Sequence, residues 1–490
     1  MNRPAPAHTI VVDLGYGDAG KGSVVDHLCR GTGVHTVVRF NGGAQAAHNV
    51  VAPDGRHHTF AQFGSGSLVP GVRTHLSRFV LVDPLALATE AAHLRSLGVA
   101  DPFGGLTVDR RALLTTPYHA AANRLRETAR GRDRHGSCGV GVGETAAYAL
   151  AHPDDAPTAG DCTSPSTLSA KLTRLRDRLG TDLAAQGINP AEPLGPPPGD
   201  CATAFRAFAA HTTLTDDDHL PRLLRTGPVV FEGAQGVLLD EWHGFHPYTT
   251  WSTTTFANAE TLLHEADADP GLRLGVLRSY TTRHGPGPLV TEDPTLTPVL
   301  AEPHNGHGRW QGAFRRGHFD AVAHRYALAA CGGADALALT HLDAPARFRY
   351  LSLCETYDLD GADVADLPAA VPGDLDRQAR LTTALLRARP GRTSTPGASP
   401  RAWTEAVEAA LDTPVLLTSH GPRSTDKELL RPAGTLLAQR LSPWQIPPWQ
   451  RSRTAGGTDE QRRPEPRPPL GARPAPRSLQ QPRPVPALGG

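Results

Sequence analysis

Short apolar runs rich in β-branched residues recur along the first 420 residues of the chain. Glycine, proline and polar clusters bound them, which is typical of buried strands. The runs cover residues 8–14, 35–40, 78–82, 228–233, 272–278, 334–340 and 414–419. Helical patterns lie between several of them, for example over 318–331 and 402–411. This alternation predicts an α/β fold with a large, mostly parallel central sheet flanked by helices, and ligands beyond the carboxyl ends of its strands.

Three stretches depart from this alternation. Residues 151–226 combine Pro/Gly/Asp-rich turns with helical pieces and predict a mostly helical excursion, and 359–400 are similar. From about residue 443 the chain is rich in proline and arginine and nearly free of large aliphatic residues. Such a segment cannot bury enough surface to offset its ordering entropy, so we expect it to be disordered. An inert tail is favoured over a proline-motif ligand. We therefore expect one domain over 1–440 and a disordered tail over 441–490.

Composition excludes few classes of protein. Lys and Arg together number 49 and so do Asp and Glu, so bulk charge gives no indication of a nucleic-acid or membrane partner. The six cysteines form no close pairs, which is typical of reduced thiols. The amino terminus lacks a signal-peptide pattern, and no stretch approaches the roughly 20 apolar residues of a membrane helix. We expect a soluble cytoplasmic protein that binds neither nucleic acid nor membrane.

The loop after the first strand run carries phosphate chemistry. Gly15, Gly20 and Lys21 have the spacing of a nucleotide-triphosphate loop, but Gly22 stands where such a loop needs Ser or Thr to hold magnesium. Asp18 lies inside the loop, where a carboxylate is costly unless it binds a cation or accepts a proton. The alternative is an ordinary glycine-rich turn. Lysine is rare in this chain, which makes its presence in the loop more informative.

Four further motifs follow in order. They are "VVRFNGGAQAAHNVV" at 37–51, "VVFEGAQGVLLDEWHGFHPYTTWSTTT" at 229–255, "RSYTTRHGPGPLVTED" at 278–293 and "LTHLDA" at 339–344. Together with the first loop they resemble the adenylosuccinate synthetase family over about residues 8–426. The resemblance implies a P-loop-like nucleotide fold, a homodimer and a GTP-dependent ligase that joins L-aspartate to IMP with Mg²⁺. It also explains the missing hydroxyl, because the family holds magnesium with the loop aspartate and a backbone carbonyl.

The resemblance assigns catalytic roles to three residues. Asp18 matches the base that takes the proton from N1 of IMP, and it also ligates magnesium together with the carbonyl of Ala47. His48 matches the histidine that stabilises charge on the phosphates; alone, it would be read as a solvent-exposed loop histidine. Gln235 matches a glutamine that hydrogen-bonds the reacting purine edge.

The same resemblance implies the binding residues. For GTP they are Gly17, Gly20, Lys21, Gly22, His341, Asp343, Ser419 and Gly421, with Asp343 as the guanine reader rather than a helix cap. For IMP they are Asp18, Gln45, Ser137, Cys138, Gln235 and Thr254.

The chain departs from the family pattern at the acceptor sites. Cys138 replaces a phosphate-binding threonine and is a weaker donor. The arginine that a partner subunit usually offers falls near His152, with no arginine nearby. The arginine-rich aspartate loop becomes "GRWQGAFRRGHFD" at 308–320, which leaves Arg309, Arg315 and Arg316 as candidates for binding the amine.

Three interpretations therefore stay open. The first is a divergent adenylosuccinate synthetase serving AMP synthesis. The second is an enzyme with the same two-step chemistry but another amine or purine acceptor. The third is a non-catalytic nucleotide-binding remnant.

Overall fold

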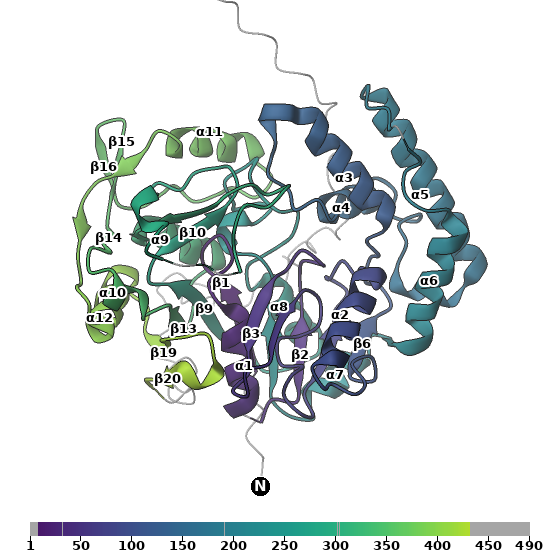
Figure 1. Ribbon diagram of the computed structural model, residues 1–490, viewed down its shortest axis with the longest axis horizontal. Helices are drawn as coiled ribbons and strands as arrows, with labels where there is room; N and C mark the ends of the chain where they lie inside the picture. Colours follow the sequence, from purple (N-terminus) through teal and green to yellow (C-terminus); the bar gives the residue numbers. More distant parts are fainter. Residues whose placement is uncertain (1–7, 32, 191, 301, 303, 432–490) are drawn as a thin grey trace, which may run out of the picture.

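A twisted, ten-stranded sheet forms the centre of the molecule (Figure 1). The computed structural model describes residues 8–31, 33–190, 192–300, 302 and 304–431. The strand order is β20-β19-β13-β9-β1-β8-β2-β5-β6-β7, and all neighbours pair in parallel except β19 with β20. In chain order these strands are β1 (Thr9–Asp13), β2 (Thr36–Arg39), β5 (Arg73–Leu76), β6 (Leu106–Asp109), β7 (Thr213–Thr215), β8 (Val229–Glu232), β9 (Leu272–Arg278), β13 (Ala336–Thr340), β19 (Val415–Ser419) and β20 (Lys427–Leu429).

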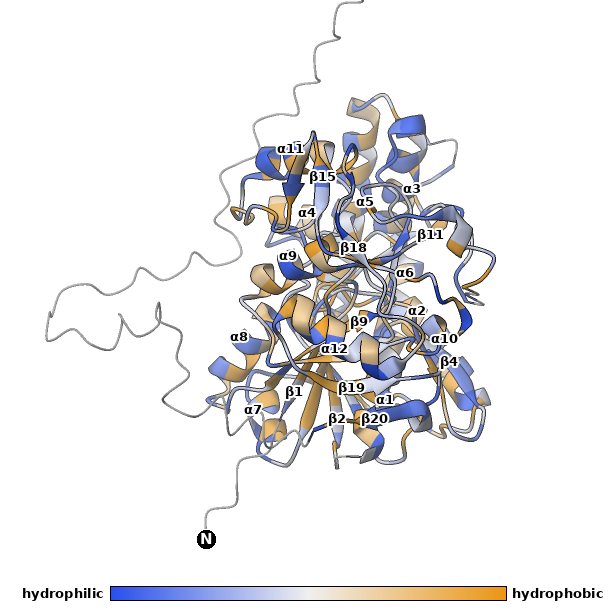
Figure 2. Cartoon of the chain, turned by 90° about the vertical axis from the view of Figure 1, so that its left-hand side faces the viewer, coloured by the Kyte–Doolittle hydropathy of each residue, from blue (hydrophilic) through white to orange (hydrophobic). Residues whose placement is uncertain are grey.

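Both faces of the sheet are buried. Along β1, Ile10 and Val12 point into one hydrophobic core and Val11 into another, as the two-residue period of a strand requires. The first core also contains residues of α8 (Ala257–Glu265), α9 (Ala321–Cys331) and α12 (Pro400–Leu411), whereas α1 (Lys21–Gly31) packs into the second. The central strands are hydrophobic along their length in Figure 2. The predicted mostly parallel sheet with helices on both faces is confirmed.

Six of the seven predicted strand runs coincide with strands, and the run at 78–82 is wrong. These residues form a turn that ends in two isolated bridges, Leu81 to Gly43 and Val82 to Leu114, while the strand itself is β5 at 73–76. Val80 and Val82 are buried, so their apolar character reflects packing beneath the turn. The sequence of β5, Arg-Thr-His-Leu, has no apolar run, and its buried Thr74 and His75 obey no simple hydrophobic pattern.

Residues 151–226 are largely helical and pack with earlier helices beside the sheet (right of Figure 1). They also contain β7, which returns to form the edge of the sheet. The helices of this region are α2 (Pro84–Ser96), α3 (Pro117–Arg130), α4 (Val142–Ala151), α5 (Pro165–Ala185), α6 (Pro198–His211) and α7 (His219–Leu224), with 3₁₀ turns η1 (Gly131–Asp133) and η2 (Ala159–Thr163).

Small sheets and short elements complete the fold above the strand ends. They are β3 (His48–Val51), β4 (His57–Phe60), β10 (Thr281–His284), β11 (Phe314–Gly317), β12 (Phe319–Asp320), β14 (Leu353–Cys354), β15 (Tyr357–Leu359), β16 (Ala362–Val364), β17 (Arg389–Pro390), β18 (Thr393–Ser394), α10 (Ala344–Arg347), α11 (Leu375–Leu385), η3 (Val237–Leu239), η4 (Pro294–Leu296) and η5 (Ser424–Asp426). In the described part of the chain, no helix is both long and apolar enough to cross a bilayer. The predicted tail at 441–490 lies outside the described residues.

Candidate active site

The loop after β1 is wrapped around the side chain of Asp13, the last residue of that strand. The Asp13 carboxylate accepts hydrogen bonds from the backbone N–H groups of Gly15 (2.8 Å) and Ala19 (2.9 Å) and from Nζ of Lys21 (3.0 Å). Asp13 and Lys21 are both buried. An internal carboxylate thus fills the turn that a phosphate would fill in a nucleotide-triphosphate loop. Sequence reasoning missed Asp13, although a charged residue ending an apolar strand was a usable signal.

The third motif lies directly against this loop. Lys21 Nζ also donates to the carbonyl of Gln235 at 2.7 Å, and the backbone of Leu238 donates to the carbonyl of Gly15. Gly236 approaches the loop so closely that a β-carbon there would lie 2.3 Å from the Gly15 carbonyl oxygen. Only glycine fits at 236, and the two motifs form one structural unit.

The second motif is tied to the third by a pair of hydrogen bonds. Asn41, just beyond β2, accepts from the N–H of Ala234 (2.7 Å) and donates to its carbonyl (3.0 Å). Beside this contact, the Gln235 amide lies against Gly42 and the Gln45 amide against Gly43. Among the described residues, both amide atoms of Gln45 and Oε1 of Gln235 are buried without a hydrogen-bond partner. Such groups are rare in native structures, and here they fit a polar ligand such as a purine edge.

His48 reaches the same place from the start of β3. A β-carbon at Gly22, the second residue of α1, would lie 2.8 Å from Cβ of His48 and 3.1 Å from Oγ of Ser65. The backbone of α1 therefore lies directly against the histidine, and a Ser or Thr at position 22 does not fit. This contact gives a steric reason for the glycine after the lysine.

A buried glutamate orients His48. Glu232, at the end of β8, accepts from Nδ1 of His48 (2.6 Å) and from the N–H of Ser65 (2.9 Å). Burial alone would raise the pKa of Glu232, but the charges of Arg39 and His48 outweigh it and lower that pKa to about 2. The ionised carboxylate fixes the imidazole with Nδ1–H toward Glu232 and Nε2 away from it. Glu232 and Arg39 were not predicted as site residues.

Asp18 lies three residues before α1 begins, in a left-handed backbone conformation with φ of 59°. Its carbonyl accepts from Nε of Arg278 at 2.7 Å, and its carboxylate lies 3.3 Å from Nε2 of His284. The Asp18 side chain is 24% exposed, whereas the residues that support it are largely buried. Asp18 and His48 thus lie at the same end of α1, one in the loop before it and the other against its first turn.

The predicted guanine residues gather at the ends of β13 and β19, which are neighbours in the sheet. Leu342 N–H donates to the carbonyl of Ser419, and Thr340 Oγ1 donates to the carbonyl of Ala19 in the first loop. Burial, followed by the charge of Arg278, lowers the pKa of His341 to about 3, so its imidazole is neutral. The Asp343 carboxylate is 2.8 Å from the exposed Arg347.

The predicted IMP-phosphate residues make internal contacts. Ser137 Oγ donates to Asn123 (2.8 Å), and Thr254 Oγ1 donates to the carbonyl of Gly236 (3.0 Å). Burial raises the pKa of Cys138, so its thiol stays protonated. The loop around Cys138 contacts the predicted amine loop at 308–320, because the ring of Trp310 lies against Gly139.

The three candidate amine-binding arginines occupy different environments. Arg315 donates to Glu292 and to the carbonyls of Gly285 and Gly287, and the buried Arg316 donates to the carbonyl of Leu300. Arg309 is exposed, with its guanidinium 5.1 Å from the Trp310 ring centre. The guanidinium groups of Arg315 and Arg316 thus already donate hydrogen bonds to other groups of the protein.

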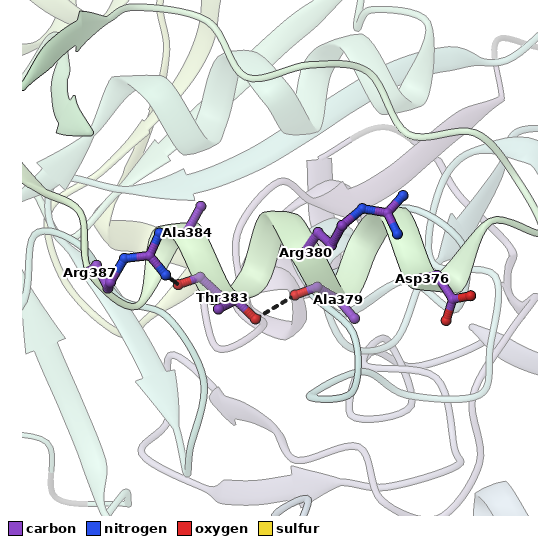
Figure 3. A pocket seen from close by; sticks show the side chains of 6 residues that line it. All are labelled: Asp376, Ala379, Arg380, Thr383, Ala384 and Arg387. Carbon is purple, nitrogen blue, oxygen red and sulfur yellow. Dashed lines mark hydrogen bonds between the residues drawn. The ribbon is translucent and has the colours of Figure 1, made fainter. Parts of the chain in front are cut away.

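A surface hollow elsewhere is not part of this site. It follows one side of α11 and is lined by five residues of that helix and by Arg387 just beyond its end (Figure 3). They are Asp376, Ala379, Arg380, Thr383, Ala384 and Arg387. It contains none of the motif residues.

Taken together, a parallel sheet with a glycine-rich loop, buried charge pairs and unpaired amides at its strand ends defines a nucleotide-dependent α/β enzyme. The family model for adenylosuccinate synthetase matches residues 10–426, and the chain belongs to this family. It is therefore a ligase that forms a C–N bond in GTP-dependent synthesis of adenylosuccinate, within purine biosynthesis.

Individual relatives agree with this assignment. The adenylosuccinate synthetase of Synechococcus sp. (strain RCC307) is 33% identical over 377 residues, which cover 74% of this chain and 82% of that protein. The fully ligated adenylosuccinate synthetase of Plasmodium falciparum has a similar fold, with a TM-score of 0.71 at 18% identity, over 87% of this chain and all of that one. The succinoaminodeoxyadenylate synthetase of cyanophage S-2L, bound to dGMP and dATP, has a TM-score of 0.55 at 17% identity, over 89% of this chain and 99% of that one.

Proposed function

We propose that Asp18 and His48 carry out the activating step of adenylosuccinate synthesis. The observation that supports this is their convergence on the amino-terminal end of α1, beside the unpaired amides of Gln45 and Gln235. A helix amino terminus favours negative charge, so it suits the γ-phosphate in transit between GTP and the purine.

The chemistry has two steps. Asp18 accepts the proton from N1 of IMP, which makes the 6-oxygen nucleophilic toward the γ-phosphate of GTP, and GDP leaves. The amine then attacks C6, and phosphate leaves with the 6-oxygen. A well-placed base contributes about 10²–10⁴-fold to such a rate. His48 is oriented by Glu232, and burial lowers the pKa of its imidazole. The negative charge of bound phosphates would favour the protonated ring, whose Nε2–H would donate to the phosphates and stabilise the charge that develops on them.

The donor groups also fit a magnesium ion. Mg²⁺ prefers hard oxygen ligands and is usually held by one or two carboxylates together with substrate phosphates. Asp18 offers a partly exposed carboxylate, and Ala47 is exposed just before β3, where its carbonyl would be the second protein ligand. The described residues contain no cluster of three metal-ligating side chains, which is consistent with this shared mode of binding. When bound, the ion would neutralise negative charge on the phosphates of GTP.

GTP would lie between the first loop and the ends of β13 and β19. Its guanine would be read by the Asp343 carboxylate beside His341, Ser419 and Gly421, and its phosphates would approach the backbone of Gly17, Gly20 and Gly22. Because the Lys21 ammonium is held by Asp13, we infer that Lys21 acts mainly through the shape of the loop. The IMP phosphate would lie near Ser137, Cys138 and Thr254. The chain would form a homodimer, but its partner offers this phosphate no arginine near His152.

The amine is L-aspartate in this proposal. The second candidate, another amine, is favoured by one observation: Arg315 and Arg316 are already bonded to internal partners, which leaves Arg309 as the exposed guanidinium. A non-catalytic remnant is not supported, because the base, the oriented histidine and the unpaired amides are all retained.

Phosphate release tests the proposal. Purified protein with GTP, Mg²⁺ and IMP is supplied with a panel of amines. Release that depends on aspartate supports the first candidate, and release only with another amine supports the second. The variant Asp18→Asn should abolish turnover while it still binds GTP; persistent turnover would show that Asp18 is not the base.

A further inference from the structure

A closed chain of side-chain contacts surrounds Asp18, and the proposed reaction does not use all of it. Nε2 of His284 lies 3.3 Å from Oδ2 of Asp18 and 3.3 Å from Oδ1 of Asn305. Nδ2 of Asn305 donates to Glu302 at 3.3 Å, and Glu302 pairs with Arg278. The hydrogen bond that Arg278 donates to the Asp18 backbone carbonyl closes this ring of contacts.

The two sides of this ring differ in burial. The Arg278 and Glu302 side chains are only 5% and 8% exposed, whereas His284 and Asp18 are 23% and 24% exposed. Burial would raise the pKa of Glu302, but the facing Arg278 outweighs it and lowers that pKa to about 2. The buried pair is therefore a fixed anchor, and the Asp18–His284 side opens toward the substrates.

The orientation of the His284 ring is fixed by its surroundings. β10 pairs with β11 so that His284 lies opposite Phe314, and the two rings meet edge to face with their centres 4.7 Å apart. Asn305 belongs to the segment that leads into the predicted amine loop at 308–320. His284 thus connects the proposed base with the segment where the amine would bind.

We propose that His284 is a positioning residue for the base, and that this role rests on the proposed function of Asp18. Its Nε2–H, shared between Asp18 and Asn305, holds the carboxylate toward the purine and couples its position to the amine segment. The resemblance to the family does not supply this role, because the pattern "YTTR-G-GP--TE" leaves position 284 unspecified.

The test separates purine activation from amine transfer. With IMP and Mg²⁺ but no amine, the γ-phosphoryl group moves reversibly between GTP and IMP. This reversal scrambles ¹⁸O between the β,γ-bridging position of GTP and the non-bridging positions of its β-phosphate. We expect His284→Val to slow both this exchange and overall turnover about tenfold or more, since it removes the donor. The KM for IMP and GTP should stay within about twofold. His284→Gln keeps an N–H donor at similar reach and should recover most of the loss.

A matched control is His35→Gln. His35 is a partly exposed histidine at the amino end of the sheet, bonded to Thr36 and Thr226, and its substitution should leave the exchange unchanged. If His284→Val does not fold, Asn305→Ala removes the second acceptor and should raise the KM for the amine more than it lowers the exchange rate.

The outcomes distinguish this inference from the proposal on which it rests. Exchange that survives in Asp18→Asn would show that Asp18 is not the base, which would overturn the proposed function. Exchange that is lost in Asp18→Asn but unchanged in His284→Val would overturn only the role of His284. A His284→Gln variant as slow as His284→Val would also overturn it, because the effect would then not depend on a donor.

Discussion

Gly22 and His48 are in such close contact that no side chain can be added between them: a β-carbon on Gly22 would lie 2.8 Å from Cβ of His48. A nucleotide-triphosphate loop of the usual kind has a hydroxyl at this position. Here His48 occupies the space that such a side chain would need. A hydroxyl-bearing residue at position 22 and a histidine at position 48 therefore exclude each other.

Gly22→Ser should therefore damage both stability and activity. The new side chain must push β3 away from α1, and overpacking of this kind costs about 1–3 kcal/mol. Denaturant unfolding measures the stability, and phosphate release with saturating substrates measures activity. Gly31→Ser at the other end of the same helix is the control, because a β-carbon there meets nothing within 4 Å. Equal effects of the two substitutions would show that the close contact does not matter.

Asp13→Asn should destabilise the protein by about 3 kcal/mol or more, because it leaves the buried Lys21 ammonium without its counter-charge. The double variant Asp13→Asn, Lys21→Met should lose less stability than the two single losses combined, since it removes both charges. Urea unfolding of the four proteins gives this coupling energy directly. Strictly additive losses would argue against the pair as the organising contact of the loop.

Glu232→Gln should reveal a pH-dependent contribution to stability. The folded pKa of Glu232, about 2, lies below its ordinary value of 4.5, so the unfolded chain binds the proton more readily. Its contribution is thus fully present above pH 4.5 and is lost as the pH falls toward 2. The variant should be about 2–3 kcal/mol less stable at pH 7, with a gap that narrows below pH 4.5.

Unfolding at a series of pH values measures that gap. Glu405→Gln is the control, because Glu405 forms only an exposed pair with Arg401 and should show little difference at any pH. A gap that widens in acid would mean that Glu232 is protonated in the folded protein.

Arg309→Ala and Arg315→Ala should have different effects. Arg309 is exposed, so its loss should raise the KM for the amine severalfold and leave unfolding unchanged. Arg315 is bonded to Glu292 and to two backbone carbonyls, so its loss should lower stability by about 1–3 kcal/mol. Steady-state kinetics with varied amine and thermal unfolding separate the two. A normal KM in Arg309→Ala would remove this residue from the amine site.

The sequence predicts the sheet well because most of its strands are buried on both faces and therefore read as apolar runs. It fails at β5, β6, β7 and β20, whose sequences of three or four residues form no apolar run. The site shows the same division. Asp18, His48 and Gln235 lie in local motifs, and the partners of Asp13 lie within eight residues of it. Glu232 and His284 instead contact partners that only folding brings close.

The carboxylate of Asp13 has a consequence for how nucleotide binding begins. A turn that already encloses its own anion keeps its shape before any ligand arrives, so little chain entropy remains to be lost on association. Nucleotide capture should then resemble docking to a rigid surface, with a single concentration-dependent phase in rapid mixing and no slow ordering step after it.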